Sequence, residues 1–327
     1  MSGEVASERW GILGVDLGGT RLRVAVFDRD GSMLHKSVIP TPRDQPQALV
    51  AAMKGALAES TIDVRCAVVG VPGPISYAEG TAIRLPNLPD WEQHISAQRL
   101  AAEVALPVLL ANDADLAALG EHRYGAGRGT TDMVYVTSST GVGAGVIIGG
   151  RLLYGQRSLA EVGHTIIERA TGRTVEDLGS GTALRRAAGM DGATVTAQAQ
   201  AGDERSRAVF REVADAFAIG VFNLVHCFMP ERVVIGGGVS QAGELLLEPI
   251  RDRLQGCGLG CSAAGADVVL ASGGDDVGLL GAFAFWLDSG RGSEQGLMPA
   301  TPSAQANEQG RAQRGPARPS PIAPLDS

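Results

Sequence analysis

The feature that most constrains this chain is a glycine turn between two short strands near its beginning. An apolar run over residues 10–15 leads into Asp16-Leu-Gly-Gly-Thr20, and apolar residues then alternate with others over 22–26, which is the period of a strand. The pair Asp30-Gly31 predicts a second turn before a third strand over 33–39. Three strands joined by turns form an antiparallel meander, and a dinucleotide-binding unit does not begin with one.

The rest of the first half alternates helices with buried strands, and a comparable series begins again at residue 133. The first series continues with a helix over 46–57, a strand over 66–71, a helix that ends over 100–105, a strand over 107–111 and a helix over 113–124. The second has strands over 133–137, 145–148 and 151–154, a helix over 205–228, a strand over 232–235, a helix over 245–254, a strand over 268–271 and a helix over 278–287. Two hairpin-led halves predict an α/β protein with an internal duplication.

Composition limits the partners and the compartment. The formal net charge of -8 and a pI near 5.2 argue against a nucleic-acid partner, because phosphate backbones favour clustered Lys and Arg. No apolar run approaches the roughly 20 residues of a membrane span, and residues 1–8 do not resemble a signal peptide, so we expect a cytoplasmic protein with no membrane partner. Residues 288–327 are rich in Gly, Pro, Ser, Ala, Gln and Arg, which predicts a disordered tail.

Lysines and cysteines exclude several common sites. The only lysines, Lys36 and Lys54, lie in neither a GxxxxGK[ST] loop nor a protein-kinase glycine loop, so those two ways of holding ATP are excluded. Four cysteines are too few for a disulfide scaffold in a chain of this size. Cys257 and Cys261 have the spacing of half a metal site, but no second pair matches them, so a glycine-rich turn is the preferred interpretation.

Three glycine-rich loops offer backbone N–H groups to an anion. Asp16 ends the first strand, so its carboxylate can hold Mg²⁺ through water while the turn beyond it faces a phosphate. Two such loops, each at the head of a hairpin, are best explained by a nucleotide triphosphate held from both sides, whereas the third leaves room for a flat ring. The loop residues are Gly18, Gly19 and Thr20 in the first, Thr140, Gly141 and Gly143 in the second, and Gly236, Gly237 and Gly238 in the third.

Asp113 begins a predicted helix directly after a buried strand, so its carboxylate can project from a rigid element. A general base must reach the hydroxyl from which it takes a proton, within a cleft that excludes water. A carboxylate in this position can also do no more than stabilise the start of the helix. The residue types alone leave both interpretations open.

Taken together and in order, the motifs resemble those of the ROK family (repressor, open reading frame, kinase), which includes bacterial glucokinases. The resemblance covers about residues 11–287. Its motifs are Asp16-Leu-Gly-Gly-Thr20, Val71-Pro-Gly-Pro-Ile75, Pro86-Asn-Leu-Pro89 with Trp91, Asn112-Asp113, Ser139-Thr-Gly-Val-Gly-Ala-Gly145, Glu161-Val-Gly-His164, Val234-Ile-Gly-Gly-Gly238 and Gly273-Gly-Asp-Asp-Val-Gly-Leu-Leu-Gly281.

The resemblance implies two actin-like (ribonuclease H-like) domains around a central cleft, formed by residues 9–111 with 276–287 and by residues 112–275. It implies ATP and Mg²⁺ as cofactors, a homodimer, and phosphoryl transfer to a sugar hydroxyl, with glucose as the first choice and mannose or N-acetylated hexosamines behind it. Asp113 would be the catalytic base. The sugar contacts implied are Asn87, Asn112, Asp113, Glu161, His164 and Glu176.

The chain departs from the family at its zinc cluster. ROK proteins usually follow the signature His with a CxCGxxGC sequence, whereas here residues 165–176 contain no cysteine. A zinc site cannot be built from these side chains, so we expect no zinc, and ordinary packing would hold the loop. Other interpretations remain: a sugar sensor without catalysis, an actin-like ATPase that acts on proteins, or a repressor, which is disfavoured because the first strand begins near residue 10.

Overall fold

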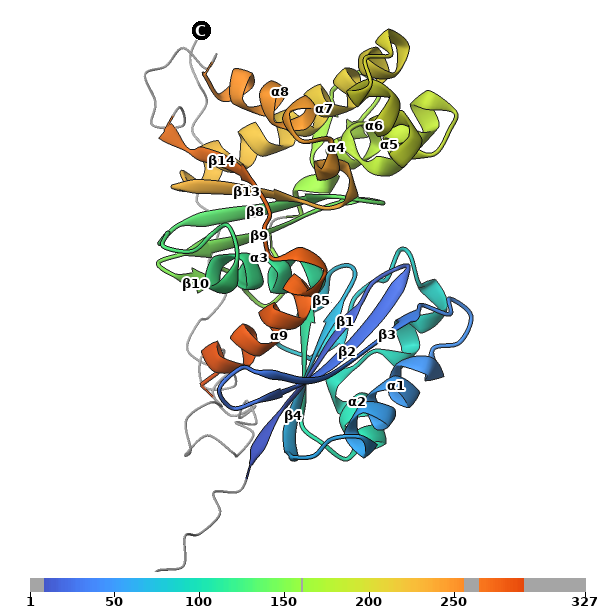
Figure 1. The fold of residues 1–327 in the computed structure, drawn as a ribbon, viewed down its shortest axis with the longest axis vertical. Helices are drawn as coiled ribbons and strands as arrows, with labels where there is room; N and C mark the ends of the chain where they lie inside the picture. Colours follow the sequence, from blue (N-terminus) through green and yellow to red (C-terminus); the bar gives the residue numbers. More distant parts are fainter. Residues whose placement is uncertain (1–8, 160, 256–264, 291–327) are drawn as a thin grey trace, which may run out of the picture. The chain divides into compact units, whose positions relative to one another are not determined.

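The computed structural model describes residues 9–159, 161–255 and 265–290. Its first sheet contains the predicted meander, because β1 pairs antiparallel with β2 and β2 antiparallel with β3. On its other side β1 pairs parallel with β4, and β4 pairs parallel with β7 (Figure 1). The strand order is β3-β2-β1-β4-β7, with β1 Trp10–Leu17, β2 Arg21–Asp28, β3 Met33–Pro40, β4 Asp63–Val71 and β7 Val108–Asn112.

The second sheet has the same plan. Strand β8 pairs antiparallel with β9 and parallel with β13, and β10 and β14 occupy the edges. The strand order is β10-β9-β8-β13-β14, with β8 Met133–Ser138, β9 Val142–Ile148, β10 Arg151–Leu152, β13 Arg232–Gly236 and β14 Asp267–Leu270. Two sheets of one design confirm the α/β class and the predicted hairpin-led halves.

Helices cover both sheets because their apolar faces need a surface to bury against. The first sheet carries α1 Gln47–Ala58 and α2 Ala97–Val104, whose residues join its core through Leu49, Met53 and Leu100. In the second half the long helix α7 buries Phe210 and Phe217 in the core. The second half contains α4 Val175–Gly179, α5 Gly181–Ala188, α6 Gly192–Gln200, α7 Glu204–Phe228 and α8 Glu244–Gln255.

Two further helices, α3 Asp113–Tyr124 and α9 Val277–Asp288, lie between the two sheets (Figure 1). They pack against each other so closely that no side chain fits between their backbones at two positions. A Cβ atom on Gly281 would overlap the carbonyl oxygen of Leu116, and one on Gly120 would overlap that of Val277. Because α3 also contacts β8 and β9 while α9 contacts β1 and β4, this helix pair connects the two halves.

The structure adds short elements that the sequence did not predict. Each is too short, or too weakly alternating, for a hydrophobic period to register. They are β5 Ile75–Ser76, β6 Thr81–Ala82, β11 Ile166–Glu168, β12 Arg173–Thr174 and the 3₁₀ turns η1 Pro89–His94, η2 Val162–His164 and η3 Gly238–Ala242. The strand expected over 151–154 is shorter in the structure, where β10 ends at Leu152. The last helix, expected to end at residue 287, continues to Asp288. The division into domains stays a prediction. Most of the predicted tail lies outside the described residues, and so do Cys257 and Cys261.

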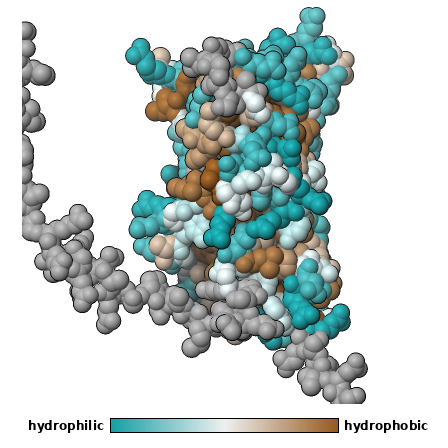
Figure 2. Space-filling view, turned by 90° about the vertical axis from the view of Figure 1, so that its left-hand side faces the viewer, coloured by the Kyte–Doolittle hydropathy of each residue, from teal (hydrophilic) through white to brown (hydrophobic). Residues whose placement is uncertain are grey.

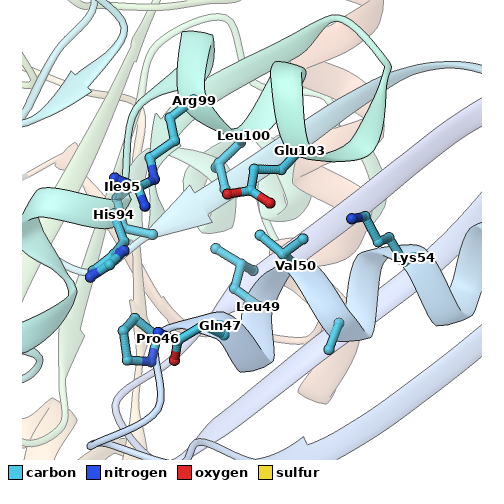
Figure 3. A pocket seen from close by; sticks show the side chains of 11 residues that line it. Pro46, Gln47, Leu49, Val50, Lys54, His94, Ile95, Arg99, Leu100 and Glu103 are labelled. Atoms are coloured by element: carbon cyan, nitrogen blue, oxygen red, sulfur yellow. The ribbon is translucent and has the colours of Figure 1, made fainter.

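A small pocket of about 270 Å³ lies on the first half, between α1 and α2. Figure 3 shows Leu49, Val50 and Lys54 of α1 facing Leu100 and Glu103 of α2 across it. None of the residues predicted for the phosphate or sugar sites lines this pocket. It is therefore separate from the chemistry predicted for this chain.

The exposed surface of the described residues is mixed in character. On the face in Figure 2, small hydrophobic patches are broken up by hydrophilic residues. Scattered exposed hydrophobic side chains are ordinary for a globular protein. Among the described helices, none combines the length and the apolar character that crossing a membrane requires. The predicted homodimer stays a prediction.

Candidate active site

The first glycine loop is a tight turn between β1 and β2. The N–H of Gly18 donates to the carbonyl oxygen of Arg21 (2.9 Å), and the Thr41 hydroxyl donates to the carbonyl oxygen of Gly18 (2.7 Å). A Cβ atom on Gly19 would lie 3.5 Å from that of Asn87, so the exposed Asn87 lies beside this turn. The turn therefore brings one predicted sugar residue next to the first predicted phosphate loop, which also includes Thr20.

Asp16 lies near the end of β1 and forms an ion pair with Arg23, its partner across the β1–β2 ladder (3.0 Å). Burial raises the pKa of Asp16, the positive charge of Arg23 lowers it, and the negative charge of Asp276 raises it again. One carboxylate oxygen of Asp16 bonds to Arg23. This arrangement holds the carboxylate in place at the end of a strand.

Asn112 is the N-cap of α3. Its Oδ1 atom accepts hydrogen bonds from the backbone N–H groups of Ala114 (2.9 Å) and Asp115 (3.1 Å), and its Nδ2 atom donates to the carbonyl oxygen of Gly73 (2.9 Å). Side-chain oxygens at this position satisfy N–H groups that have no partner within the helix. Asn112 thus caps α3, a role for which Asp113 was also a candidate. The predicted contact of Asn112 with the sugar stays a prediction.

Asp113 occupies the first helical position of α3, and one of its oxygens accepts a hydrogen bond from the N–H of Ala114 (2.9 Å). Its pKa is raised to about 7, first by burial and then by the negative charge of Asp16, with a smaller contribution from Glu161. A carboxylate that exchanges its proton near neutral pH can act as a general base. The pKa of Asp113 is therefore compatible with the role of general base, which stays a prediction.

The second glycine loop lies against the start of α3. A Cβ atom on Gly143 would lie 3.3 Å from that of Ala114, the residue after Asp113. The N–H of Val142 donates to a carboxylate oxygen of Glu176 (2.9 Å), and that carboxylate lies where a side chain on Gly141 would be. The carbonyl oxygen of Thr140 accepts a hydrogen bond from the Thr182 hydroxyl (2.7 Å). The N–H of Val142 in this loop is thus satisfied by the Glu176 carboxylate, and the predicted phosphate contacts of the loop stay a prediction.

Glu161 and His164 lie at the two ends of η2, and both side chains are exposed. Their nearest charged atoms are 3.9 Å apart. Although the Glu161 side chain is only partly withdrawn from water, this partial burial raises its pKa, His164 lowers it, Glu176 raises it and Ser158 lowers it. The charge of Glu161 also raises the pKa of Asp113. Electrostatic interactions therefore link Asp113 with Glu161 and Glu161 with Glu176, while their common contact with a sugar stays a prediction.

The third glycine loop follows β13, and packing accounts for two of its three glycines. A side chain on Gly236 would overlap the Tyr135 hydroxyl, and one on Gly237, whose φ is 84°, would overlap the carbonyl oxygen of Ser138. Gly238 has open space where its Cβ atom would be. The loop thus packs on Tyr135, whose pKa the charges of Asp113 and Asp16 help to raise, and on Ser138, which directly precedes the second glycine loop. Its predicted adenosine role stays a prediction.

Glu121 is a buried residue that the sequence reasoning missed. Its carboxylate accepts hydrogen bonds from the backbone N–H groups of Ala126 (2.7 Å), Ser272 (3.1 Å) and Gly273 (2.7 Å). It thereby joins the end of α3 to the loop before α9, which lies about 150 residues further along the chain. A glutamate on the buried face of a predicted helix was the available signal, because such a charge needs partners.

The segment between His164 and Glu176 is a small hairpin, β11–β12, held by an ion pair. Arg173 donates two hydrogen bonds to the two oxygens of Glu168 (2.7 and 2.6 Å), and Thr171 also donates to Glu168. The bonds from Arg173 lower the pKa of Glu168 to about 2. A capping box formed by Thr174 then begins α4 one residue before Glu176. Among the described residues, no group of three or more His, Cys, Asp or Glu side chains is placed to hold a metal ion.

We predict that this ion pair helps to position Glu176. Replacing Arg173 with alanine is expected to raise the KM for the sugar by roughly three- to tenfold with a smaller effect on kcat, because a displaced contact weakens binding. Steady-state kinetics on the variant measure both constants.

The control for this change is Arg169→Ala, which removes an exposed arginine from the same hairpin. Exchange of the two charges, with Glu168→Arg and Arg173→Glu together, is expected to restore much of the affinity. An unchanged KM in Arg173→Ala would show that the hairpin does not position the site.

The fold and these loops define a class, an α/β protein of two actin-like halves in which the second glycine loop and several acidic residues lie near the start of α3. The ROK family model matches residues 12–289, so the chain belongs to the ROK family. It is 34% identical to a glucokinase of Halalkalibacterium halodurans, over 84% of this chain and 94% of that one. It is 32% identical to an N-acetylmannosamine kinase of Shigella boydii, over 83% and 96% respectively. A ROK glucokinase of Streptomyces griseus, solved with glucose and AMPPNP, superposes with a TM-score of 0.70 at 30% identity, over 84% of this chain and 98% of that one.

Proposed function

We infer that this protein is an ATP-dependent sugar kinase, and we propose that it phosphorylates glucose to glucose 6-phosphate. The observation that carries the proposal is the carboxylate of Asp113, with a pKa of about 7, at the start of α3 beside the second glycine loop. The relatives named glucokinase, and the related glucokinase solved with glucose and an ATP analogue, support it.

In this proposal the chain's own residues bind and orient the sugar. Asp113 takes the proton from the acceptor hydroxyl, and its raised pKa lets it do so near neutral pH. Glu161, His164 and Glu176 bind the remaining hydroxyls, together with Asn87 and Asn112. A site that binds hydroxyls through polar groups rejects analogues that lack one, because a buried polar group is then left without a partner.

The residues present fit a nucleotide with its metal ion. Gly19 and Gly238 leave space that a Cβ atom would fill, whereas the N–H of Val142 is engaged by Glu176 and is not a free donor for a phosphate. Asp16 offers an oxygen besides the one that bonds to Arg23, and carboxylate oxygen suits Mg²⁺. When bound, ATP supplies the phosphoryl group, and Mg²⁺ neutralises the charge that develops on it. Asp16 would hold the ion through water.

The second candidate substrate is N-acetylmannosamine, which the relative from Shigella boydii favours. The same polar contacts serve either sugar, so the shape of the loops around them decides the choice. A catalytically silent sugar sensor is the other outcome that remains open to test.

The deciding experiment is a panel of glucose, mannose, N-acetylglucosamine and N-acetylmannosamine with ATP and Mg²⁺, in which ADP release is measured. We expect one sugar, glucose, to raise ADP release at least about tenfold above the ATPase background, because the γ-phosphate reacts only when the acceptor is in line. Polyphosphate in place of ATP tests the donor. A response to no sugar, in protein shown to be folded by circular dichroism, would overturn the proposal in favour of the sensor.

A further inference from the structure

Asp115 is a second buried carboxylate on the same helical turn as Asp113. Asp115 is 1% exposed, so it is almost completely withdrawn from water. The Tyr77 hydroxyl donates a hydrogen bond of 2.7 Å to its Oδ2 atom. A buried carboxylate is costly without partners, so its position two residues after the proposed base calls for an explanation.

Tyr77 connects Asp115 to several parts of the chain. It follows β5 directly, and its ring packs against Tyr154 (ring centroids 4.6 Å apart) and Phe285 of α9 (6.1 Å). Its hydroxyl also accepts a hydrogen bond of 3.4 Å from the N–H of Asn112. The first half, α3 and α9 therefore meet at one side chain.

The β5–β6 hairpin in turn holds the segment that leads to Glu161. The N–H of Ser158 donates to the carbonyl oxygen of Ile75 (3.0 Å), and the N–H of Ile75 donates to the Ser158 hydroxyl oxygen (3.2 Å). The Ser158 side chain also lowers the pKa of Glu161. Hydrogen bonds and ring contacts thus run from Asp115 through Tyr77 and the hairpin to Ser158, three residues before the proposed sugar contact Glu161.

We propose that Asp115 is a positioning residue: through Tyr77 it holds the β5–β6 hairpin against the first turn of α3, and it places a second negative charge close to Asp113. The inference rests on the proposed function of Asp113 as the base. Asp115 itself contacts neither sugar nor nucleotide in this proposal. Its effect reaches the reaction through Asp113 and through the hairpin.

The charges around the pair determine the sign of the effect. Burial raises the pKa of Asp115 to about 7, the bond from Tyr77 lowers it, and the charges of Asp113 and Glu161 raise it. Repulsion between two carboxylates is reciprocal, so ionised Asp115 makes Asp113 hold its proton more tightly. The other titratable groups around them are Tyr154, Tyr135 on β8, and Asp16, which is paired with Arg23. Removal of the Asp115 charge must therefore let Asp113 ionise at lower pH.

The first test is Asp115→Asn, which keeps the size of the side chain and an oxygen acceptor for the Tyr77 hydroxyl but removes the charge. The pH dependence of kcat/KM for the sugar is measured with ATP and Mg²⁺. In the unmodified protein we expect activity to fall below about pH 7, as Asp113 becomes protonated. In Asp115→Asn we expect this fall to move by roughly 0.5 to 1 pH unit toward lower pH.

The second test is Tyr77→Phe, which removes only the hydroxyl that joins the hairpin to α3. We expect the KM for the sugar to rise roughly tenfold with a smaller change in kcat, because the segment before Glu161 loses its attachment. Tyr154→Phe is the matched control: it removes a hydroxyl from the same aromatic cluster on a half-exposed ring and should change neither KM nor the pH profile.

The outcomes separate this inference from the proposed function. If Asp115→Asn leaves the pH profile unmoved and Tyr77→Phe leaves KM unmoved while Asp113→Asn abolishes turnover, the inference is wrong and the proposed base stands. If Asp113→Asn keeps its turnover, the proposed function fails instead. Should Asp115→Asn not fold, Tyr77→Phe decides alone, with an unchanged KM counting against the inference.

Discussion

Replacing Asp113 with asparagine is expected to lower kcat by about 10²- to 10⁴-fold, because that is what the loss of a general base typically costs. Asparagine keeps the size and polarity of the side chain but cannot take the proton from the sugar hydroxyl. Helix α3 should still form, because Asn112 supplies its cap. The variant is therefore expected to keep its thermal midpoint and much of its sugar affinity. Turnover is measured by ADP release, and sugar affinity by calorimetry.

The control for Asp113→Asn is Asp215→Asn, the same substitution at an exposed position in the middle of α7. It should leave kcat unchanged. Turnover of Asp113→Asn within tenfold of the unmodified protein would remove Asp113 from the role of base. The nearby carboxylates Asp16 and Glu161 would then be the candidates to test, because their charges already act on the same site.

Replacing Gly281 with alanine is expected to destabilise the protein by about 3 kcal/mol, because even one methyl group has no room between α9 and α3. Its carbon would overlap the backbone carbonyl of Leu116, and a helix backbone cannot move aside as a flexible side chain can. The two helices would have to separate. The free energy of unfolding is measured by urea denaturation followed by circular dichroism.

The change is also expected to lower activity, because α9 begins close to Asp16 and the proposed phosphate loop. A Cβ atom on Gly278 would lie 3.0 Å from the carboxyl carbon of Asp16, so a shift of α9 disturbs Asp16. Gly55→Ala is the matched control: this glycine lies on the exposed face of α1, with no atom within 4 Å of its would-be Cβ, and the same substitution should stabilise by roughly 0.5 to 1 kcal/mol. Equal stability of the two variants would mean that α3 and α9 are not in backbone contact.

Much of the architecture was predictable from local sequence, because long strands and helices carry a strong hydrophobic period. The meander at the start, the helix over 113–124 and the long α7 were predicted nearly to their ends. The β11–β12 hairpin was not, because its two- and three-residue strands depend on an ion pair between Glu168 and Arg173 rather than on buried apolar residues.

The candidate site was predictable only in part. The sequence indicated Asp16 through its glycine loop and Asp113 through the buried strand before it, whereas Glu161 followed from the resemblance to the ROK family. The cap at Asn112 was missed although its bonds are local, because Asp113 was the candidate for that role; Asn directly before a helix is a favoured N-cap. The bond from Val142 to Glu176 joins residues 34 positions apart, so only the folded structure reveals it.

By itself, the sequence determined the strands, the helices and the residues with reactive side chains, because each depends on a few neighbours along the chain. Tertiary structure alone decided which of those residues meet. It buried Asp115 against Tyr77 and brought α9 into backbone contact with α3. The proton affinity of Asp113 depends on burial and on the charges of Asp16 and Glu161 from two other segments, and that environment exists only after folding.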